Sequence, residues 1–463
     1  MVELEKVDDV APRNKVEFGT DGIRGKAGEF PLDLPTVRRI GAALVRALPH
    51  GQSGAPIRFL SGRDTRESGS WIERELAFGI RSQGGSLTSA GTIPTPAVAY
   101  LTPRLGYTAG VVISASHNPF DYNGIKVFSG AGEKFTEALE HHVESIIEDE
   151  TWSTPAGEAP AVEQIDYRND YVEHLRGILP EASRFKGMRI AIDCANGATI
   201  TVAPRLFQEL GFDVRCIGCE PDGHNINLHC GSTAPEQLAS LVKQGGYRLG
   251  IAYDGDGDRA ILVDANGRIV NGDPVMLLCA KQMKAEGRLK QNAIVATVLS
   301  NLGLRDGLRD AGIEMVTCSV GDKYVMEEMI RRDLSLGGEQ SGHVIFSDYL
   351  FTGDGIATSL NVLRTMMATA RELDDLAADY VPYPQLALNV RVPKKPELET
   401  VPAVKQVVDS AAAELADDGR VVVRYSGTEP ALRIMVEGKD AATVHRLAHE
   451  IEDAVKQHIG TAV

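Results

Sequence analysis

Hydrophobic positions along the chain gather into short, nearly continuous runs, and each run is followed by a polar, glycine-rich loop and an amphipathic segment. The pattern is clearest in "YTAGVVISASHNP" (107–119), "GMRIAIDCANGATITVAPRLFQELGF" (187–212), "YRLGIAYDGDGDR" (247–259) and "NAIVATVLSNLGLRDGLRDAG" (292–312). Apolar strands that alternate with helices are typical of parallel or mixed sheets covered on both faces. The pattern therefore predicts an α/β protein whose ligands bind in the loops where strands end.

Proline-rich segments indicate where the domains meet. Residues 151–161 ("TWSTPAGEAPA") and 381–399 ("VPYPQLALNVRVPKKPELE") have the composition of linkers. The chain of 463 residues is too long to fold around one ordinary hydrophobic core. Its length corresponds to three or four domains of about 100–200 residues each. We predict α/β domains at 1–160, 161–256 and 257–372, and a smaller α+β domain at 373–463 that contains a helix, a hairpin and a final helix.

The charge balance narrows the classes of ligand. The chain carries 48 Lys and Arg against 64 Asp and Glu, and this net charge of −16 argues against binding to nucleic acid or to an anionic membrane. An anionic small molecule would need a local cluster of cations. The first 15 residues are acidic and lack the apolar region of a signal peptide, and no window approaches the ~18 apolar residues of a membrane span. We therefore expect a cytoplasmic protein.

The six cysteines are sparse for a chain of this length, so we do not expect a disulfide framework. The motif "CIGC" at 216–219 has the spacing of a zinc knuckle, but no second pair with this spacing follows it. Metal or redox use is the alternative, while the surrounding sequence favours structural thiols at the end of a strand.

Three aspartates, Asp254, Asp256 and Asp258, alternate with glycine in "DGDGDR" after a predicted strand. An EF-hand is excluded, because the positions that would need Gly and Glu hold Arg259 and Ala265. Clustered carboxylates with few other ligands suit Mg²⁺, and the alternative is a solvated acidic turn. Arg259 would offset surplus negative charge and hold a phosphate group.

Ser116 stands on a tight loop after the buried strand of "VVISASHNP", which is a position typical of a nucleophile. The G-x-S-x-G motif of hydrolases is absent, and a Ser116–His117 pair does not follow from adjacency. A capped turn is the alternative. Arg24 in "FGTDGIRG" could reach a ligand, whereas Arg63 and Arg66 in "SGRDTRESG" are interpreted as exposed structural arginines.

Two further loops carry groups suited to a sugar phosphate. The turn "GGEQSGH" offers donors and acceptors that fit sugar hydroxyls, although an ordinary polar turn is equally open. Its polar residues are Glu339, Gln340, Ser341 and His343. The hairpin "RYSGTEPALRIMVEG" combines guanidinium, hydroxyl and glycine-freed backbone groups into a phosphate cradle. Its polar residues and glycine are Arg424, Ser426, Gly427, Thr428 and Arg433. No Walker A motif occurs, so ATP is not implied.

The motifs "FGTDGIRG", "SASHNP", "DGDGDR", "GGEQSGH" and "RYSGTEPALRIMVEG" occur in this order, and with them the chain resembles the α-D-phosphohexomutase family over nearly its whole length. The form of the third loop that carries Gln340 is similar to that of the bacterial glucosamine branch of the family. The resemblance implies three similar α/β domains with mixed sheets and a smaller C-terminal α+β domain, in a heart-shaped arrangement around a central cleft. Each domain would contribute one active-site loop.

The resemblance also implies roles for single residues. Ser116 would be the phosphoserine, and it would bind one Mg²⁺ ion together with Asp254, Asp256 and Asp258. The basic residues near the transferred phosphate would be Arg24 and Lys126. The sugar-binding residues would be Glu339, Ser341 and His343, with further ligand contacts from Lys323 and Arg259. The phosphate that does not react would be held by Arg424, Ser426, Gly427, Thr428 and Arg433. Lys126 and His343 are the candidates for the general base, and Lys126 is favoured if neighbouring cations lower its pKa.

The implied reaction interconverts glucosamine 6-phosphate and glucosamine 1-phosphate through a glucosamine 1,6-bisphosphate intermediate, and it would feed UDP-N-acetylglucosamine and cell-wall precursor synthesis. The partner is thus a small sugar phosphate, not nucleic acid or a membrane, and the resemblance is compatible with a homodimer. A phosphomannomutase or phosphoglucomutase is the nearest alternative. From other classes, a metal-dependent sugar phosphatase or a non-catalytic sensor would leave Ser116 without a phosphoryl group.

Overall fold

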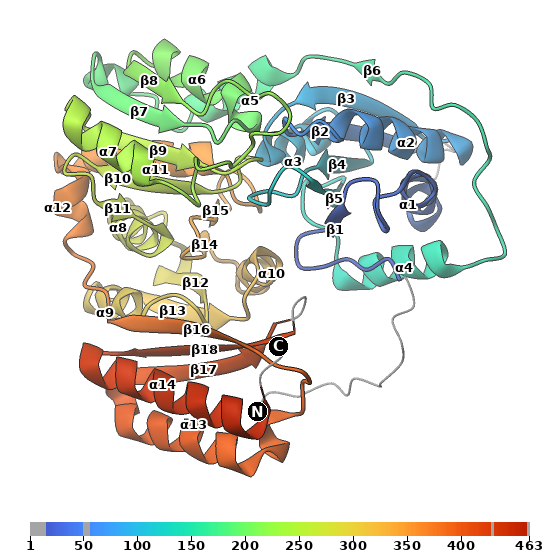
Figure 1. Cartoon of the computed structure of the whole chain (residues 1–463). Helices are drawn as coiled ribbons and strands as arrows, with labels where there is room; N and C mark the ends of the chain where they lie inside the picture. The colour runs from blue at the N-terminus through green and yellow to red at the C-terminus, as the bar shows by residue number, and fades with distance from the viewer. Residues whose placement is uncertain (1–14, 50–55, 427–429, 461–463) are drawn as a thin grey trace. The chain divides into compact units, whose positions relative to one another are not determined.

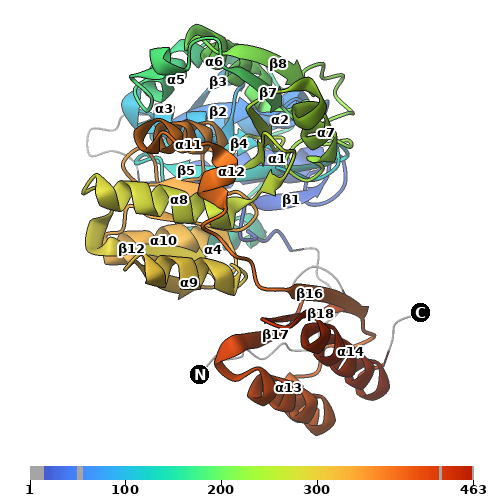
Figure 2. The same ribbon diagram turned by 90° about the vertical axis from the view of Figure 1, so that its left-hand side faces the viewer.

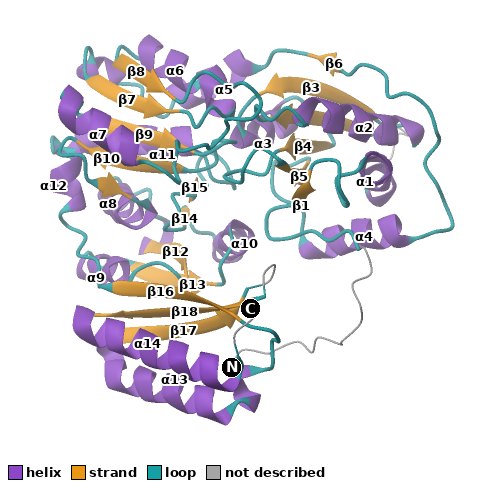
Figure 3. Ribbon diagram, in the orientation of Figure 1, coloured by secondary structure: helices purple, strands orange, loops and turns teal. Residues whose placement is uncertain are grey.

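The computed structural model describes residues 15–49, 56–426 and 430–460. Within these ranges the chain forms two compact units, which are described separately. The first comprises the described residues up to Val298 together with Val316–Ala377, and the second comprises Leu299–Met315 together with those from Ala378 onward. Both units are built from strands and helices (Figure 1, Figure 3). No helix within the described ranges is both long enough and apolar enough to cross a membrane.

The first α/β domain is built on a six-stranded mixed sheet. Its strands are β1 (Ile23–Lys26), β2 (Arg58–Arg63), β3 (Ser86–Thr92), β4 (Ala109–Ile113), β5 (Tyr122–Ser129) and β6 (Glu163–Gln164). Its helices are α1 (Leu34–Ala47), α2 (Gly69–Ser82), α3 (Thr95–Arg104) and α4 (Glu137–Glu148). The strand order is β1-β5-β4-β2-β3-β6, in which β2 pairs parallel with β3 and β4, and β5 pairs antiparallel with β4 and β1.

Side chains that alternate along β2 explain why helices cover both faces of this sheet. Phe59 belongs to the core cluster that α1, α2 and α4 also form, and the alternate positions Leu60 and Gly62 face the opposite side. A Cβ atom on Gly62 would lie 2.5 Å from a methyl carbon of Val98 in α3, so glycine lets this helix pack closely on the sheet.

The second α/β domain contains a five-stranded sheet. Its strands are β7 (Arg189–Asp193), β8 (Asp213–Ile217), β9 (Leu249–Tyr253), β10 (Ala260–Asp264) and β11 (Ile269–Val270). The helices of this region are α5 (Arg168–Arg176), α6 (Ala203–Glu209) and α7 (Glu236–Gly245). The strand order is β11-β10-β9-β7-β8. The boundary predicted after residue 256 divides this sheet, because the chain turns back there and pairs β10 antiparallel with β9.

The third α/β domain has a four-stranded sheet. Its strands are β12 (Ala293–Thr297), β13 (Glu314–Cys318), β14 (Leu336–Gly338) and β15 (Val344–Phe346), in the order β13-β12-β14-β15. Its helices are α8 (Gly272–Ala285), α10 (Asp322–Arg332), α11 (Gly355–Thr369) and α12 (Leu373–Ala377). Val325 and Met329 of α10 pack against Val295 of β12 in the core of this domain.

The second unit carries the C-terminal domain. Its elements are α9 (Leu302–Asp310), β16 (Gln385–Arg391), α13 (Pro402–Leu415), β17 (Gly419–Tyr425), β18 (Ala431–Gly438) and α14 (Ala441–His458). The strands form an antiparallel sheet in the order β16-β18-β17, and α13 and α14 cover one face of it (Figure 2). Buried Glu437 accepts hydrogen bonds from the Leu302 amide and from Arg420 Nε, both at 2.7 Å, and so fixes α9 to this sheet. The predicted fold class, three α/β domains and a smaller α+β domain, is confirmed.

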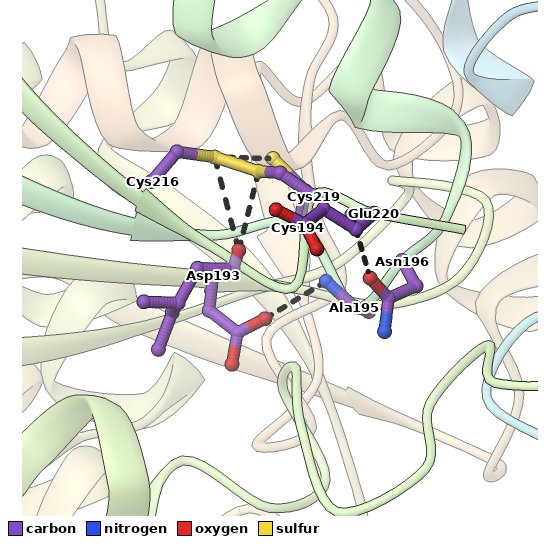
Figure 4. Close-up of a disulfide and its surroundings, with 8 residues drawn as sticks. Asp193, Cys194, Ala195, Asn196, Cys216, Cys219 and Glu220 are labelled. Atoms are coloured by element: carbon purple, nitrogen blue, oxygen red, sulfur yellow. Dashed lines mark hydrogen bonds between the residues drawn. A yellow bond between two sulfur atoms is a disulfide. The ribbon is translucent and has the colours of Figure 1, made fainter. Parts of the chain in front are cut away.

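A disulfide joins Cys216 and Cys219, so the expectation of free structural thiols is wrong for this pair (Figure 4). Cys216 is the second-last residue of β8. Gly218, with a φ of 58°, turns the chain back directly after the strand. The reversal leaves the two Cα atoms 6.4 Å apart, within the range of a disulfide. The other four cysteines are free thiols, and these are Cys194, Cys230, Cys279 and Cys318.

Candidate functional site

Ser116 lies on the loop that connects the antiparallel strands β4 and β5. Its side chain is buried, and its φ of 54° is a left-handed conformation that residues other than glycine adopt rarely. The Ser116 amide donates to Ser114 Oγ at 2.9 Å, which fixes the turn. A buried serine in a strained backbone conformation is a frequent feature of functional sites.

Arg66 holds the carbonyl groups of this loop, and the side chain is buried rather than exposed as expected. Its Nη2 donates to the carbonyl oxygens of Ser116 at 3.0 Å and of Asn118 at 2.8 Å. Its Nη1 donates to the Tyr122 carbonyl at 2.9 Å, and its Nε donates to Asp64 Oδ2 at 2.8 Å. The expectation fails because loop carbonyls and a buried carboxylate replace water around the guanidinium.

Replacing Arg66 with methionine is expected to lower the free energy of unfolding by about 3–5 kcal/mol, because buried Asp64 and the loop carbonyls lose their partner. Looser positioning of Ser116 should also lower kcat by about tenfold or more. Denaturant titration and initial-rate kinetics measure the two effects. The control is Arg74→Met, since Arg74 is exposed on α2 and should change stability by less than about 0.5 kcal/mol. Equal losses in both variants would contradict the role of Arg66.

The three aspartates lie on the loop between β9 and β10, and all are buried. One carboxylate oxygen of each lies within 4.8 Å of the others, so the cluster could hold a metal ion. Asp256 Oδ1 and Asp258 Oδ1 are buried and make no hydrogen bond within the part of the chain that the structure describes. Buried oxygens without a partner are costly, and a hard divalent cation would satisfy them. The residues present therefore fit such an ion.

Gly255 brings the aspartate loop into contact with the serine loop. A Cβ atom at residue 255 would lie 2.5 Å from the carbonyl oxygen of Ser116, so a larger residue would push the two loops apart. At this separation Ser116 Oγ donates to Asp254 Oδ2 at 2.6 Å. The structure thus brings together the serine and the aspartates that were singled out from the sequence.

Lys126, on β5, adds a positive charge to the cluster. Its Nζ lies 2.7 Å from Asp256 Oδ2 and 3.2 Å from Asp258 Oδ2. It also lies 2.8 Å from Asp21 Oδ2. Burial by itself would lower the pKa of Lys126, but the three carboxylates outweigh burial and raise the pKa well above its ordinary value. The expectation that neighbouring cations lower this pKa is therefore wrong.

The charges around the aspartates shift the pKa values of Asp254 and Asp258 in opposite directions. Burial and the neighbouring carboxylates of Asp258 and Asp256 raise the pKa of Asp254 well above its usual range. Burial would raise the pKa of Asp258, but the neighbouring positive charges, Lys126 first among them, together outweigh burial and lower the pKa of that carboxyl. A bound dication would favour the fully ionised form of all three groups.

Asp21, in the motif "FGTDGIRG", connects three cations beside the cluster. Besides Lys126, it accepts hydrogen bonds from Arg24 and from Lys134 Nζ, the latter at 2.7 Å. Burial would raise the pKa of Asp21, yet the nearby cations, Lys126 first among them, lower it well below its usual value. Arg24 Nε is buried and makes no hydrogen bond among the described residues, as expected beside a bound anion.

His117 contacts Ser116 in the structure, which adjacency in sequence could not establish. Its Nδ1 lies 3.3 Å from Ser116 Oγ and 3.2 Å from Arg259 Nη1. Burial, and then the charges of Arg259 and Arg24, lower the pKa of His117 to about 4, so its ring is neutral at pH 7. Arg259 Nε, like Arg24 Nε, is buried without a hydrogen bond in the described ranges.

The predicted sugar-binding turn connects β14 and β15 as a tight hairpin. The Glu339 amide donates to the His343 carbonyl at 2.9 Å, and Gly342 closes the turn with a φ of 90°. The Ala260 amide donates to the Gly342 carbonyl at 3.1 Å, which places this turn beside the aspartate loop. Ser341 is exposed and Glu339 is half-buried, so both side chains can reach a ligand.

Three other predicted residues of this region have protein partners. His343 is buried, and its Nε2 accepts from the Gly353 amide at 3.2 Å, while its Nδ1 makes no hydrogen bond among the described residues. Lys323 is buried at the start of α10 and pairs with Glu140 of α4. Gln340 Nε2 donates to Asp273 Oδ2 at 3.3 Å.

In the second unit, the predicted phosphate cradle lies on the hairpin of β17 and β18. Arg424 and Arg433 are directly opposite each other in the antiparallel pair. Burial and the charge of Arg433 lower the pKa of Arg424. Like charges across a strand pair are destabilising, and a bound anion would offset this repulsion. Ser426 lies at the end of β17 and is buried. Gly427 and Thr428 lie outside the described residues.

Several residues of the site were not singled out by the sequence. Thr95 Oγ1 donates to Asp256 Oδ2 at 2.6 Å, and Asn227 Nδ2 donates to the Ser116 carbonyl at 2.9 Å. Asp21 stands in a quoted motif and could have been found there, whereas Thr95, Asn227 and Lys134 belong to no quoted motif.

Sequence profiles of four domain families match the chain. They are described as Phosphoglucomutase/phosphomannomutase alpha/beta/alpha domain I (15–154), domain II (169–267), domain III (271–383) and C-terminal domain (388–454). The chain is also similar to the phosphoglucosamine mutase of Koribacter versatilis, with 46% identity over 452 residues, covering 96% of this chain and 97% of the relative. The phosphoglucosamine mutase of Solibacter usitatus is 47% identical over 450 residues, covering 96% and 99%.

Solved structures resemble the chain over nearly its full length. A phosphoglucomutase/phosphomannomutase family protein from Burkholderia thailandensis matches with a TM-score of 0.76 and 25% identity, covering 96% of this chain and 98% of that one. Aspergillus fumigatus N-acetylphosphoglucosamine mutase, in complex with GlcNAc-6P and magnesium, matches with a TM-score of 0.68, covering 96% of each chain. At 17% identity, this second likeness concerns the fold alone.

Proposed function

Since the chain belongs to the phosphoglucomutase/phosphomannomutase family, we propose that it interconverts glucosamine 6-phosphate and glucosamine 1-phosphate in the cytoplasm. The observation that carries the proposal is the 2.6 Å contact of Ser116 Oγ with Asp254 Oδ2, at a cluster of three buried carboxylates. Relatives named phosphoglucosamine mutase at 46% and 47% identity support the amino sugar as substrate. The product would feed amino-sugar nucleotide and cell-wall precursor synthesis.

In the proposed cycle, Ser116 carries a phosphoryl group and transfers it to the free hydroxyl oxygen of the sugar phosphate. The new P–O bond forms on the sugar, the bond to Ser116 Oγ breaks, and the hydroxyl proton passes to a base of the protein. The resulting glucosamine 1,6-bisphosphate turns around and returns its other phosphoryl group to Ser116. Asp254, Asp256 and Asp258 would hold Mg²⁺, which supplies positive charge against the phosphoryl oxygens.

The cationic side chains have distinct tasks in this proposal. Lys126 is held protonated by its carboxylate neighbours, so it donates a hydrogen bond to the transferring group instead of accepting a proton. His343 is then the base we favour. The Nε groups of Arg24 and Arg259, which donate no hydrogen bond within the described part of the chain, would bind phosphoryl oxygens.

Recognition of the rest of the substrate would involve two other loops. Glu339 and Ser341 would bind hydroxyl and amino groups of the sugar. Arg424 and Arg433 would bind the phosphate that does not react, since this pair offers two guanidinium groups on one hairpin.

The test compares kcat/KM for the 6-phosphates of glucosamine, glucose and mannose at matched concentrations, with Mg²⁺ and a catalytic amount of hexose bisphosphate. We expect at least about tenfold preference for glucosamine 6-phosphate, which corresponds to about 1.4 kcal/mol of transition-state binding. Faster turnover of glucose or mannose phosphate would contradict the substrate assignment. Release of inorganic phosphate in place of the 1-phosphate would indicate a phosphatase.

A further inference from the structure

Three cysteines of the second α/β domain have their sulfur atoms within 4.8 Å of one another. The disulfide of Cys216 and Cys219 follows β8, and Cys194 follows the neighbouring strand β7 (Figure 4). Cys194 Sγ lies 3.9 Å from Cys216 Sγ. The proposed mutase mechanism uses none of these sulfur atoms.

The position of the disulfide does not suit a structural cross-link. It joins residues only three positions apart, and the stabilisation from a cross-link grows with the length of the loop that it closes. Both cysteines are partly exposed, whereas Cys194 is fully buried. A soluble dithiol can therefore reach the Cys216–Cys219 bond from the solvent. The C-x-x-C spacing is also that of dithiols that exchange readily.

Groups around the disulfide are arranged to accommodate its reduced form. The carbonyl oxygen of Ile217 lies 3.2 Å from Cys219 Sγ and 3.8 Å from Cys216 Sγ, so it can accept a hydrogen bond from a newly formed thiol. A sulfur in a disulfide carries no proton, so Cys194 is the donor in its contact with Cys216. Burial raises the pKa of Cys194 to about 12, which keeps this thiol protonated.

Hydrogen bonds connect this segment to the serine loop. The carbonyl of Gly218, between the two cysteines, accepts from the Asn196 amide at 2.7 Å. The adjacent Ala195 carbonyl accepts from the Asn227 amide at 2.9 Å. Asn227 Nδ2 in turn donates to the Ser116 carbonyl at 2.9 Å. Three hydrogen bonds therefore lead from the C-x-x-C turn to the reactive serine.

The turn at residues 194–197, which is hydrogen-bonded to the C-x-x-C turn, also contacts the aspartate loop. The Ala198 amide donates to the Gly255 carbonyl at 2.8 Å, and Gly197 packs against the backbone of Gly255 so closely that a side chain would collide with it. Ala195 and Asn196 have φ values of 54° and 49°, conformations that need support from their surroundings. Release of the Cys216–Cys219 bond would remove part of that support.

We propose that Cys216 and Cys219 form a redox-active dithiol–disulfide site, and that reduction by a dithiol lowers turnover by loosening the turn at residues 194–197. A thiolate of the reductant attacks Cys219 Sγ, the Cys216–Cys219 bond breaks, and Cys216 Sγ takes the electron pair and a proton. The second thiolate of the reductant then attacks the mixed disulfide, Cys219 leaves as a thiol, and the reductant leaves as a cyclic disulfide. Cys194 donates a hydrogen bond to the Cys216 thiolate as it forms.

The test begins with the unaltered full chain, purified without reductant and then equilibrated with dithiothreitol under native conditions. Alkylation and peptide mass spectrometry report which cysteines react. We expect Cys216 and Cys219 to be unreactive at first and both labelled after reduction, with reversal on oxidation. If both are labelled in the protein as purified, or if a stoichiometric zinc ion protects them, the proposed site is wrong.

Activity before and after reduction tests the connection to the serine loop. We expect kcat to fall by about threefold to tenfold on reduction and to recover on oxidation. A Cys216→Ser, Cys219→Ser variant should show the lower rate with no response to dithiothreitol. The control is Cys318→Ser, which removes a partly exposed free thiol and should keep the full response. An unchanged rate after complete reduction would overturn the proposed effect on turnover.

The labelling result does not depend on the proposed mutase activity. If the protein turns over no hexosamine phosphate in either redox state, the proposed function fails while the alkylation pattern still decides the redox site.

Discussion

Replacing Ser116 with alanine is expected to abolish mutase turnover, with a loss in kcat of about 10⁴-fold or more. The hydroxyl oxygen is the only non-hydrogen atom removed, and the proposed cycle depends on it as phosphoryl donor and acceptor. Intact-mass measurement should show one phosphoryl group on the unaltered protein and none on the variant. Asp254 keeps the Gly257 and Arg259 amides as donors, and His117 keeps its contact with Arg259, so the fold and the melting temperature should change little.

The matched control for this variant is Ser145→Ala. Ser145 is exposed on α4 and donates to the backbone of its own helix, so its loss should leave turnover and phosphorylation unchanged. Peptide mapping that finds the phosphoryl group on another serine, or full turnover in the Ser116 variant, would refute the assignment.

Replacing Asp256 with asparagine is expected to lower kcat by about 10²–10³-fold and to raise the magnesium concentration needed for half-maximal rate. The amide has nearly the same shape as the carboxylate, but it removes one negative charge from the cluster and a charged partner from Lys126. Chelation of divalent cations should abolish the rate of the unaltered protein, and added Mg²⁺ should restore it.

The control for this second variant is Asp310→Asn, since Asp310 is a largely exposed residue of α9. Its magnesium dependence should equal that of the unaltered chain. If chelation leaves the unaltered enzyme active, or if both variants respond to magnesium alike, the aspartate cluster is not the metal site.

The serine and aspartate loops could be singled out from the sequence because the residues that distinguish each loop are close neighbours along the chain. Three aspartates interrupted by glycine have few roles other than binding a cation or forming a polar turn, and Ser116 follows an apolar run that predicts a buried strand. The alternation of such runs with amphipathic segments was sufficient for the α/β fold class as well.

Residues whose role depends on distant partners were misjudged. Arg66 resembles an exposed arginine in a polar turn, yet the carbonyls that bury it lie 50 and 52 positions further along the chain. The pKa of Lys126 is set mainly by burial and by carboxylates, and Asp256 is 130 positions away. Only the assembled domain brings these charges together, so local composition gave the wrong direction for the pKa.

The expectation of free thiols at Cys216 and Cys219, and the placing of a domain boundary after residue 256, inside a sheet, share a different cause. Both depend on how the chain reverses after a strand, at Gly218 in one case and between β9 and β10 in the other. A motif of four residues does not reveal whether two sulfur atoms face each other. Similarly, an acidic loop at a strand end does not reveal whether the next strand joins the same sheet.

The close approach of Gly255 to Ser116 has a consequence for motion during the reaction. Because the two loops touch through backbone atoms, Ser116 and the three aspartates are held at a fixed separation. In the proposed cycle, both half-reactions would then use this one fixed arrangement. The proposed bisphosphate would have to bring each of its ends to the same point, and the large displacement would belong to the sugar.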